Sequence, residues 1–178
     1  HEPVDDGNGG TEPLFTCNLY LQKSEDAYQV LQHIAGIFRG MSFWNGSQIV
    51  VDADTARDCE YVITRVNVIG GAFIKTGSAA SDRHTIAQVA YSNPANNYET
   101  DYAMVRNEQA IAQYGINVLD LSAVGCTSEG QAYRMGLAAL LAETNRTQTV
   151  SFAMGLDGSL PSVASRIDIA DMMFTGAN

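Results

Sequence analysis

The clearest periodic pattern in the chain is an amphipathic helix between Ser24 and Gly40. Ser24 suits the N-cap, Arg39 suits the negative end of the helix dipole, and Gly40 can adopt the left-handed conformation that ends a helix. Apolar residues recur at spacings of three and four, which places them on one helix face: Ala27, Val30, Leu31, Ile34, Ala35 and Phe38.

Alternating apolar and polar residues predict strands on both sides of this helix. Leu14–Leu21 has the period of a strand, as do Met41–Trp44 and Ser47–Asp52. Asn45-Gly46 separates the last two strands, and Asn-Gly is favoured in two-residue hairpin turns because both residues need a positive φ. The helix should cover one face of this sheet, since a lone hairpin is marginally stable.

The second half of the chain is predicted to be rich in strands. A short helix should lie between Asn107 and Gly115, and a long one should begin near Thr127 or Ser128, where Ser128 and Gln131 form a capping box. Its apolar arc includes Leu137 and Leu141, so it should be largely buried. The expected strands are Tyr61–Val66, Thr85–Tyr91, Tyr98–Val105, Ile116–Leu121, Thr147–Met154 and Arg166–Ile169.

These elements predict an α+β fold with two parts. A small strand-helix-hairpin unit spans residues 14–66, and a β-rich domain spans residues 67–178 with its long buried helix at about 128–144. Residues 1–13 are polar, acidic and rich in glycine, which is typical of a mobile lead-in.

Composition supports a globular chain and excludes some partners. Of 178 residues, 46% are apolar and 17% charged, which is typical of a protein with a packed core. The formal net charge of -10 argues against non-specific binding to nucleic acid. No apolar run is long enough to span a bilayer, and the N-terminal residues lack the pattern of a signal peptide. The three cysteines, Cys17, Cys59 and Cys126, are expected to be reduced and structural.

Asp82-Arg83-His84, with Ser78 and Ser81 nearby, is the strongest candidate for catalysis. A nucleophilic site needs a hydroxyl, a base and an orienting acid that converge in space. Proximity within one loop does not supply that geometry, so loop capping and local ion pairing are the favoured interpretation.

Candidate metal ligands are equally weak. The only histidines are His1, His33 and His84, and none stands at a metal-ligand spacing from another ligand. The acidic residues lack the pattern of a calcium loop, so a solvated surface is favoured for the candidates Asp52, Asp54, Asp58, Glu60, Asp168 and Asp171.

Aromatic residues on the predicted strands offer the last candidate site. Phe43, Trp44, Tyr91 and Tyr98 could form a stacking face for carbohydrate or nucleic acid. Aromatic residues on strands more often fill a core or an interface, which is the favoured interpretation. The residues alone therefore predict no catalytic, cofactor-binding or metal site.

Four segments, in the same order, resemble the central region of the tail tip attachment protein J family of lambda-like phages. They cover most of the chain from about residue 14 onward. The chain departs from the family pattern after Pro161, where the family commonly continues with a Pro-Gly-Asp turn and this chain has Ser162-Val163-Ala164-Ser165. The segments are SEDAYQVLQHIAGIFRGMSFWNGSQIVVDAD (24–54), SDRHTIAQVAYSNPANNYETDYAMV (81–105), YGINVLDLSAVGCTSEGQAYRMGLAALLAET (114–144) and QTVSFAMGLDGSLP (148–161).

The resemblance implies a structural role without catalysis. Family members form baseplate-like hubs, in which three copies close the distal end of the tail tube and connect to host-recognition parts. It implies a β-barrel-like hub domain in the second half, a location at the virion tail tip after synthesis in the host cytoplasm, and partners among copies of itself and neighbouring tail proteins. Leu137, Leu141 and Trp44 would then partly serve contacts with neighbours. The isolated chain should be monomeric or weakly associated.

Two other functions remain open at this stage. A host-surface carbohydrate-binding or adhesion module would need an exposed aromatic cleft. A tail-associated cell-wall hydrolase would need converging carboxylates or a metal site. We therefore expect that the chain is not an enzyme, has no cofactor, binds no specific nucleic acid and inserts no segment into a membrane.

Overall fold

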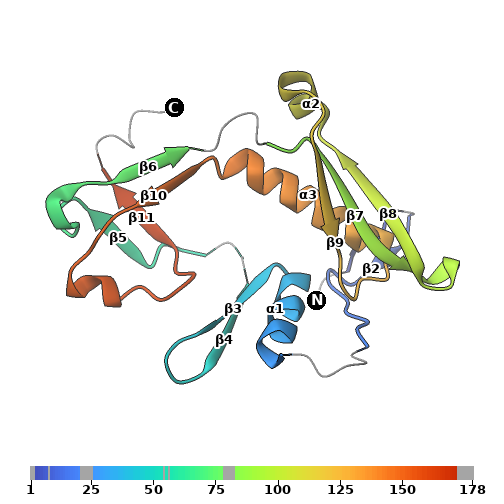
Figure 1. Cartoon of the computed structure of the whole chain (residues 1–178), viewed down its shortest axis with the longest axis horizontal. Coiled ribbons are helices and arrows are strands. Elements are labelled where there is room, and N and C mark those ends of the chain that lie inside the picture. Colours follow the sequence, from blue (N-terminus) through green and yellow to red (C-terminus); the bar gives the residue numbers. More distant parts are fainter. Residues whose placement is uncertain are drawn as a thin grey trace.

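The computed structural model describes residues 3–7, 9–20, 26–53, 55, 57–77 and 83–171 (Figure 1). Within these residues the strands form one three-stranded sheet and four two-stranded sheets, accompanied by three α-helices. The predicted α+β class is confirmed. The described strands do not close a barrel, so the β-barrel-like detail of the prediction is wrong for this part of the chain.

The three-stranded sheet and the long helix form the core of the molecule. Strand β7 (Ile86–Asn93) lies between antiparallel β8 (Glu99–Arg106) and parallel β9 (Val118–Ser122). Helix α3 (Glu129–Asn145) packs on one face of this sheet (Figure 1). The fully buried residues of this interface come from β7, β8 and α3: Ala87, Val89, Val105, Ala132 and Leu140.

Gly136 allows the helix and the sheet to approach closely. A Cβ atom at this position would lie 2.9 Å from a methyl carbon of Val89 and 2.9 Å from one of Val105. Only one stripe of α3 is buried, because Leu137 and Leu141 remain 39% and 46% exposed. The prediction of a buried helix therefore holds for one face only.

Short polar signals in this half predicted its turns correctly. The loop between β7 and β8 contains the 3-10 helix Pro94–Asn96, capped by the Asn93 side chain. Helix α2 (Glu108–Tyr114) begins after Asn107, whose side chain accepts a hydrogen bond from the Ala110 amide. Its end at Gly115, with a φ of 83°, confirms the predicted stop.

Helix α1 (Ala27–Ile37) packs against a hairpin of β3 (Gly40–Trp44) and β4 (Ile49–Ala53). The Tyr28 hydroxyl donates to the Ser42 carbonyl at 3.1 Å, which ties the helix to the hairpin. The predicted start is wrong: Asp26 is the N-cap, and Ser24 lies outside the described residues.

The end of helix α1 also differs from the prediction. Arg39, not Gly40, adopts the left-handed conformation, with a φ of 58°. Gly40 instead begins β3, where an added Cβ would lie only 2.7 Å from the Asp52 carbonyl oxygen of the paired strand. Close approach of two backbones, rather than helix termination, explains this glycine.

The hairpin turn is longer than predicted. Trp44 pairs with Ile49, so the loop has four residues rather than two. Asn45 organises it through its side-chain oxygen, which accepts from the amides of Ser47 at 3.1 Å and Gln48 at 3.0 Å. Gly46 has a positive φ whereas Asn45 does not, so the two-residue turn was a wrong prediction.

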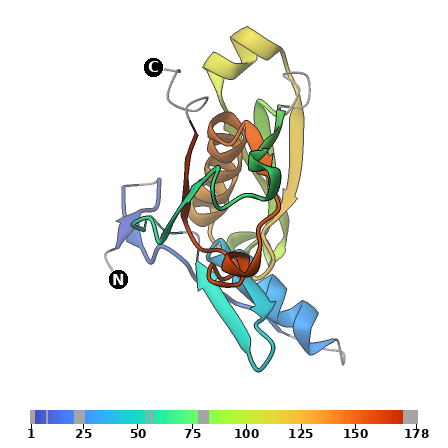
Figure 2. The ribbon, with the colours of Figure 1, turned by 90° about the vertical axis from the view of Figure 1, so that its left-hand side faces the viewer.

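The remaining sheets join segments that are far apart in sequence. Strand β5 (Tyr61–Thr64) pairs in parallel with β11 (Ile167–Ala170), and β6 (Ile74–Gly77) pairs antiparallel with β10 (Gln148–Ser151). Figures 1 and 2 show these pairs beyond the C-terminal end of α3, away from the three-stranded sheet. The β5–β11 pair joins a strand before residue 66 to one after it, so it links the two predicted domains. The division into these domains stays a prediction. Two 3-10 turns, Ile69–Gly71 and Leu156–Ser159, lie in the connections.

The N-terminal segment has a different structure from the predicted one. Residues 14–20 form no strand, so the predicted strand Leu14–Leu21 is wrong in its described part. A small antiparallel pair of β1 (Val4–Asp5) and β2 (Thr11–Glu12) precedes it, within the predicted lead-in. Among the described residues, no helix is long and apolar enough to cross a membrane.

Candidate interaction site

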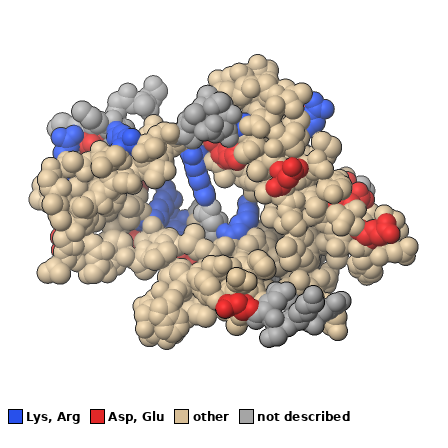
Figure 3. All heavy atoms as spheres, in the orientation of Figure 1, with Lys and Arg blue, Asp and Glu red and all other residues tan. Residues whose placement is uncertain are grey.

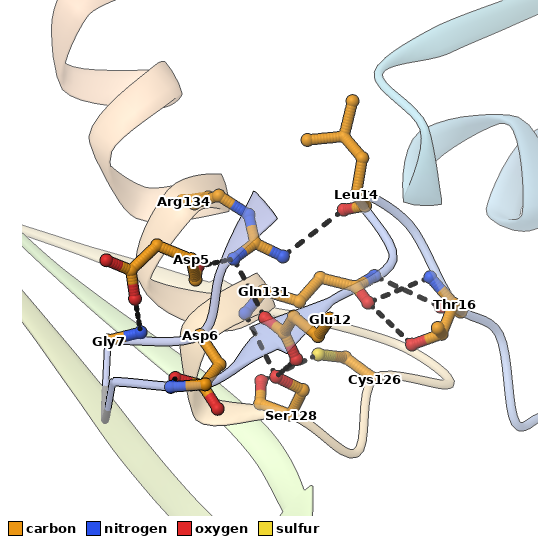
Figure 4. Close-up of polar contacts among 11 residues, drawn as sticks. Asp5, Asp6, Gly7, Glu12, Leu14, Thr16, Cys126, Ser128, Gln131 and Arg134 are labelled. Carbon is orange, nitrogen blue, oxygen red and sulfur yellow. Dashed lines mark hydrogen bonds and ion pairs between the residues drawn. The ribbon is translucent and has the colours of Figure 1, made fainter. Parts of the chain in front are cut away.

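The most connected polar cluster lies where the N-terminal segment meets the start of helix α3. Figure 4 shows Arg134 of α3 pointing between the two ends of this segment. Its guanidinium donates to the Asp5 carbonyl at 3.0 Å and to the Leu14 carbonyl at 3.3 Å, and pairs with Glu12 at 2.8 Å. One side chain thus holds both the small β1–β2 pair and the segment that follows it.

Gln131 provides the second attachment, one helical turn earlier. Its side chain is almost fully buried and makes hydrogen bonds to three atoms of Thr16. The Gln131 amide oxygen accepts from the Thr16 amide at 2.9 Å and hydroxyl at 2.7 Å, and its nitrogen donates to the Thr16 carbonyl at 3.0 Å (Figure 4). These bonds satisfy the backbone N–H and C=O of Thr16, which a neighbouring strand would otherwise pair.

Ser128 links the helix cap to this cluster. Its hydroxyl accepts from the Gln131 amide at 3.2 Å, so the predicted N-cap is confirmed. The hydroxyl also donates to the Glu12 carboxylate. The reciprocal half of the capping box is absent because the Gln131 side chain bonds Thr16 instead.

An apolar groove of about 420 Å³ runs beside the cluster, between helices α1 and α3. Leu137 and Leu141 line it from α3, and Ile37 lines it from α1. Phe15 forms part of its wall, with the Arg39 guanidinium 5.5 Å from the ring centroid. His33, a candidate ligand from the sequence, also lines the groove, whose other contributors are mostly apolar.

The structure describes only part of the candidate catalytic cluster. Ser78, Ser81 and Asp82 lie outside the described residues. The ring of His84 lies 2.9 Å from the Glu143 carboxylate on α3, and that carboxylate also accepts from the His84 amide at 2.8 Å. Arg83 donates to the Tyr114 hydroxyl at 2.7 Å. These contacts attach the loop to helices α2 and α3.

The acidic candidates are separated and mostly have protein partners. Arg57 binds Asp52, and Arg65 binds the buried Asp171 at 2.8 Å. Glu60 accepts from the Ser165 hydroxyl at 2.7 Å. Asp54 and His1 lie outside the described residues, and Asp58 and Asp168 are exposed. Within the described part of the chain, no three histidine, cysteine or acidic residues gather as metal ligands.

Hydrogen bonds and burial set the protonation of several groups. The Arg57 guanidinium hydrogen-bonded to Asp52 lowers the pKa of that carboxyl, and the Asn93 amide does the same for the pKa of Asp101. Burial raises the pKa of the Cys126 thiol and of the Tyr91 hydroxyl. Cys126 is thus held as a neutral thiol, and all three cysteines are free.

The aromatic candidates do not form one stacking face. Tyr91 is buried in the core against α3, whereas Trp44 is 61% exposed at the end of β3. Tyr98 is 66% exposed in the loop before β8, a strand that belongs to a different sheet from the β3 strand of Trp44. The aromatic residues therefore serve the core in one case and separate surfaces in the others.

Comparison with known proteins decides the family. The family described as "Putative phage tail protein" matches residues 26–172, which is most of the chain. The chain belongs to this phage tail protein family. The resemblance first noted from four segments is thereby confirmed.

Two relatives of this phage tail protein are tail tip attachment proteins. The tip attachment protein J of Escherichia phage SECphi27 is 40% identical over 171 residues, which cover 96% of this chain. That of Escherichia phage SECphi4 is 35% identical over 174 residues, covering 97%. The chain spans only 14% and 15% of the lengths of these two relatives.

Proposed function

We propose that this phage tail protein is a structural segment of the tail tip hub, which closes the distal end of the tail tube and connects it to host-recognition parts. The observation that carries this proposal is the alignment of 96% of the chain with a tip attachment protein. A match across nearly the whole chain supports a role in the same part of the virion.

The internal contacts support a role in assembly rather than in catalysis. The polar clusters described above join distant segments: Gln131 to Thr16, Arg134 to Glu12, and His84 to Glu143. A catalytic pair would need a side chain left available for substrate. In each of these pairs one side chain also bonds a backbone group, which supports a role in holding the fold together.

Exposed apolar residues support contacts with neighbouring proteins. Trp44 at the hairpin, Leu141 on α3, and Tyr102 and Met104 on β8 are 61%, 46%, 55% and 56% exposed. Large apolar side chains exposed on several elements are typical of surfaces that become buried in an assembly. We propose copies of the same chain, three per tail tip, and other tail proteins as the partners.

Immunogold electron microscopy of intact virions that carry this protein tests the proposal. Antibodies raised against the 178-residue chain should place gold at the distal end of the tail. Antibodies first absorbed with purified chain should leave the tails unlabelled, which controls for non-specific binding. Gold along the tube wall, on the capsid, or only on bacterial cell-wall fragments would contradict a place in the tail tip.

A further inference from the structure

Arginines gather around a hollow in the middle of this acidic protein. Four of the ten basic residues of the chain line a hollow of about 570 Å³, together with Asp52 and a few apolar or small residues. The arginines are Arg39, Arg57, Arg146 and Arg166. Figure 3 shows Lys and Arg side chains around the central opening, whereas most of the visible Asp and Glu side chains lie over the right-hand half.

The four arginines come from different parts of the fold. Arg39 follows helix α1, Arg57 follows β4, Arg146 caps the C-terminal end of α3, and Arg166 precedes β11. Arg39, Arg146 and Arg166 are exposed. Since repulsion between like charges opposes such a grouping, a chain with ten basic residues in all would rarely collect four of them by chance.

Backbone strain is concentrated at the same hollow. In the described part of the chain, four residues other than glycine have a positive φ, and two of them line the hollow: Arg39 at 58° and Ala164 at 69°. This conformation costs about 1 kcal/mol or more for such residues. Strain of this kind persists where the surrounding structure holds a side chain or a loop in place for a contact.

The contacts of Arg57 place a negative charge among the arginines of the hollow. Its guanidinium donates to the Asp52 carboxylate and, at 2.9 Å, to the Ala53 carbonyl. The Arg57 carbonyl in turn accepts from Arg166. Arg57 and Asp52 thus form a carboxylate–guanidinium pair inside the hollow. The negative charge of Asp52 repels a singly charged carboxylate less than a doubly charged phosphate, which favours carboxylates as the ligands.

We infer that the hollow is the docking site for an acidic peptide segment of a neighbouring tail protein. Exposed guanidinium groups on several elements suit carboxylates spaced along an extended peptide, since a guanidinium can bind a carboxylate in bidentate fashion. This inference rests on the proposed function for the presence of such a neighbour. It adds the surface and the chemistry of the contact.

A binding experiment with the whole chain tests the inference. The probe is a fluorescein-labelled peptide of alternating Glu and Gly, and binding is followed by fluorescence anisotropy at low and physiological salt. The double variant Arg39→Gln/Arg166→Gln should bind at least about fivefold more weakly than the unmodified chain. Each single variant should show part of this loss. Circular dichroism should show that the two single variants and the double variant remain folded.

The matched control is Lys75→Gln/Arg106→Gln, which removes the same number of positive charges outside the hollow. Its affinity for the peptide should stay within about twofold of the unmodified chain. Equal losses in both double variants would overturn the inference, because binding would then depend on net charge alone. Tighter binding of inositol hexakisphosphate, with displacement of the peptide, would also overturn it by showing a phosphate site.

The outcomes separate this inference from the proposed function. Gold at the tail tip together with no peptide binding would reject the docking site and leave the structural role intact. Peptide binding that depends on Arg39 and Arg166, together with gold away from the tail tip, would reject the tail-tip role instead.

Discussion

At the scale of single residues, the buried Gln131 and the partly buried Arg134 hold the N-terminal segment in place. Gln131 and Arg134 stand on adjacent turns of α3 and bond backbone groups more than a hundred residues away in sequence. Buried polar groups that lose a partner cost stability, because neither water nor protein satisfies the group that remains. The attachment of the described N-terminal residues therefore depends in part on these two side chains.

Replacing Gln131 with Leu should reduce the free energy of unfolding by about 1–3 kcal/mol. The substitution leaves the backbone N–H and C=O of Thr16 without their partners while keeping a side chain of similar size. Urea denaturation followed by circular dichroism measures the change. Gln113→Leu on the exposed face of α2 is the control and should change stability by less than about 0.5 kcal/mol.

Asp52 should give the protein a stability that depends on pH. Its pKa is lowered by the hydrogen bond from Arg57, so its contribution is fully present above the ordinary aspartate pKa of about 3.9. The contribution is lost as pH falls through the lowered pKa of the folded state. The difference in unfolding free energy between the unmodified chain and Asp52→Asn should therefore be greatest near neutral pH and should shrink as the pH falls below about 3.9.

The partner variant Arg57→Gln tests the cause of this pH dependence. In that background Asp52→Asn should have little effect at any pH, since the favourable hydrogen bond is already gone. An undiminished effect of Asp52→Asn without Arg57 would assign the stabilisation to another group.

At the scale of elements, close packing of α3 on the three-stranded sheet holds the larger half of the molecule together. Gly136 lies directly over Val89 and Val105, which belong to neighbouring strands. Glycine within a helix costs about 1 kcal/mol relative to alanine, so its presence here reflects the space available rather than helix propensity.

Gly136 in α3 and Gly36 in α1 should respond oppositely to alanine. Gly136→Ala should lower the free energy of unfolding by about 1–3 kcal/mol, because the added methyl would lie 2.9 Å from two valine methyl carbons. Gly36→Ala in α1 should raise it by up to about 1 kcal/mol, because an added Cβ there meets no atom within 4 Å. Thermal denaturation of both variants measures these changes. Stabilisation by Gly136→Ala would show that α3 does not pack this closely.

Local patterns predicted the elements of the second half well and those of the first half less well. The β7, β8 and α2 segments carry their own signals in alternation, in Asn107 and in Gly115, and these predictions are confirmed. Residues 14–20 alternate like a strand, but the backbone of Thr16 bonds the side chain of Gln131, which no local pattern reveals. The long-range pairing of β5 with β11 was invisible for the same reason.

The same limit applied to the candidate sites. Ser128 and Gln131 were found as a helix cap, but Glu12 and Arg134 were missed because their pairing joins distant segments. The arginines around the hollow are scattered in sequence, so only the folded chain brings them together. Arg83 and His84, by contrast, are adjacent in sequence, and their side chains bind a loop to α2 and α3.

At the scale of the whole molecule, small sheets arranged around one helix leave much apolar surface uncovered. Helix α3 lies between the three-stranded sheet and the β6–β10 pair (Figures 1 and 2). Helix α1 and the β3–β4 hairpin lie below it in the view of Figure 1. Such an arrangement offers many exposed edges and faces, which neighbouring subunits can cover. This agrees with a segment that works within a larger tail assembly.

Trp44→Ala in the intact tail protein should impair tail assembly without unfolding the segment. Trp44 is 61% exposed, so its loss should change the stability of the isolated chain by less than about 0.5 kcal/mol. Assembled tails are counted by electron microscopy, and infectious particles by plaque titre. Trp44→Phe keeps an apolar ring and should retain most of the assembly. Normal assembly with Trp44→Ala would show that this residue makes no contact with a neighbour.

A reconstruction of the intact tail tip by electron cryo-microscopy tests the central claim most directly. The account predicts density for α3 and its three-stranded sheet at the distal end of the tube, in three copies around the tail axis, with exposed residues such as Trp44 facing neighbouring subunits. A well-resolved tail tip without this fold, or this fold found elsewhere in the particle, would contradict the account.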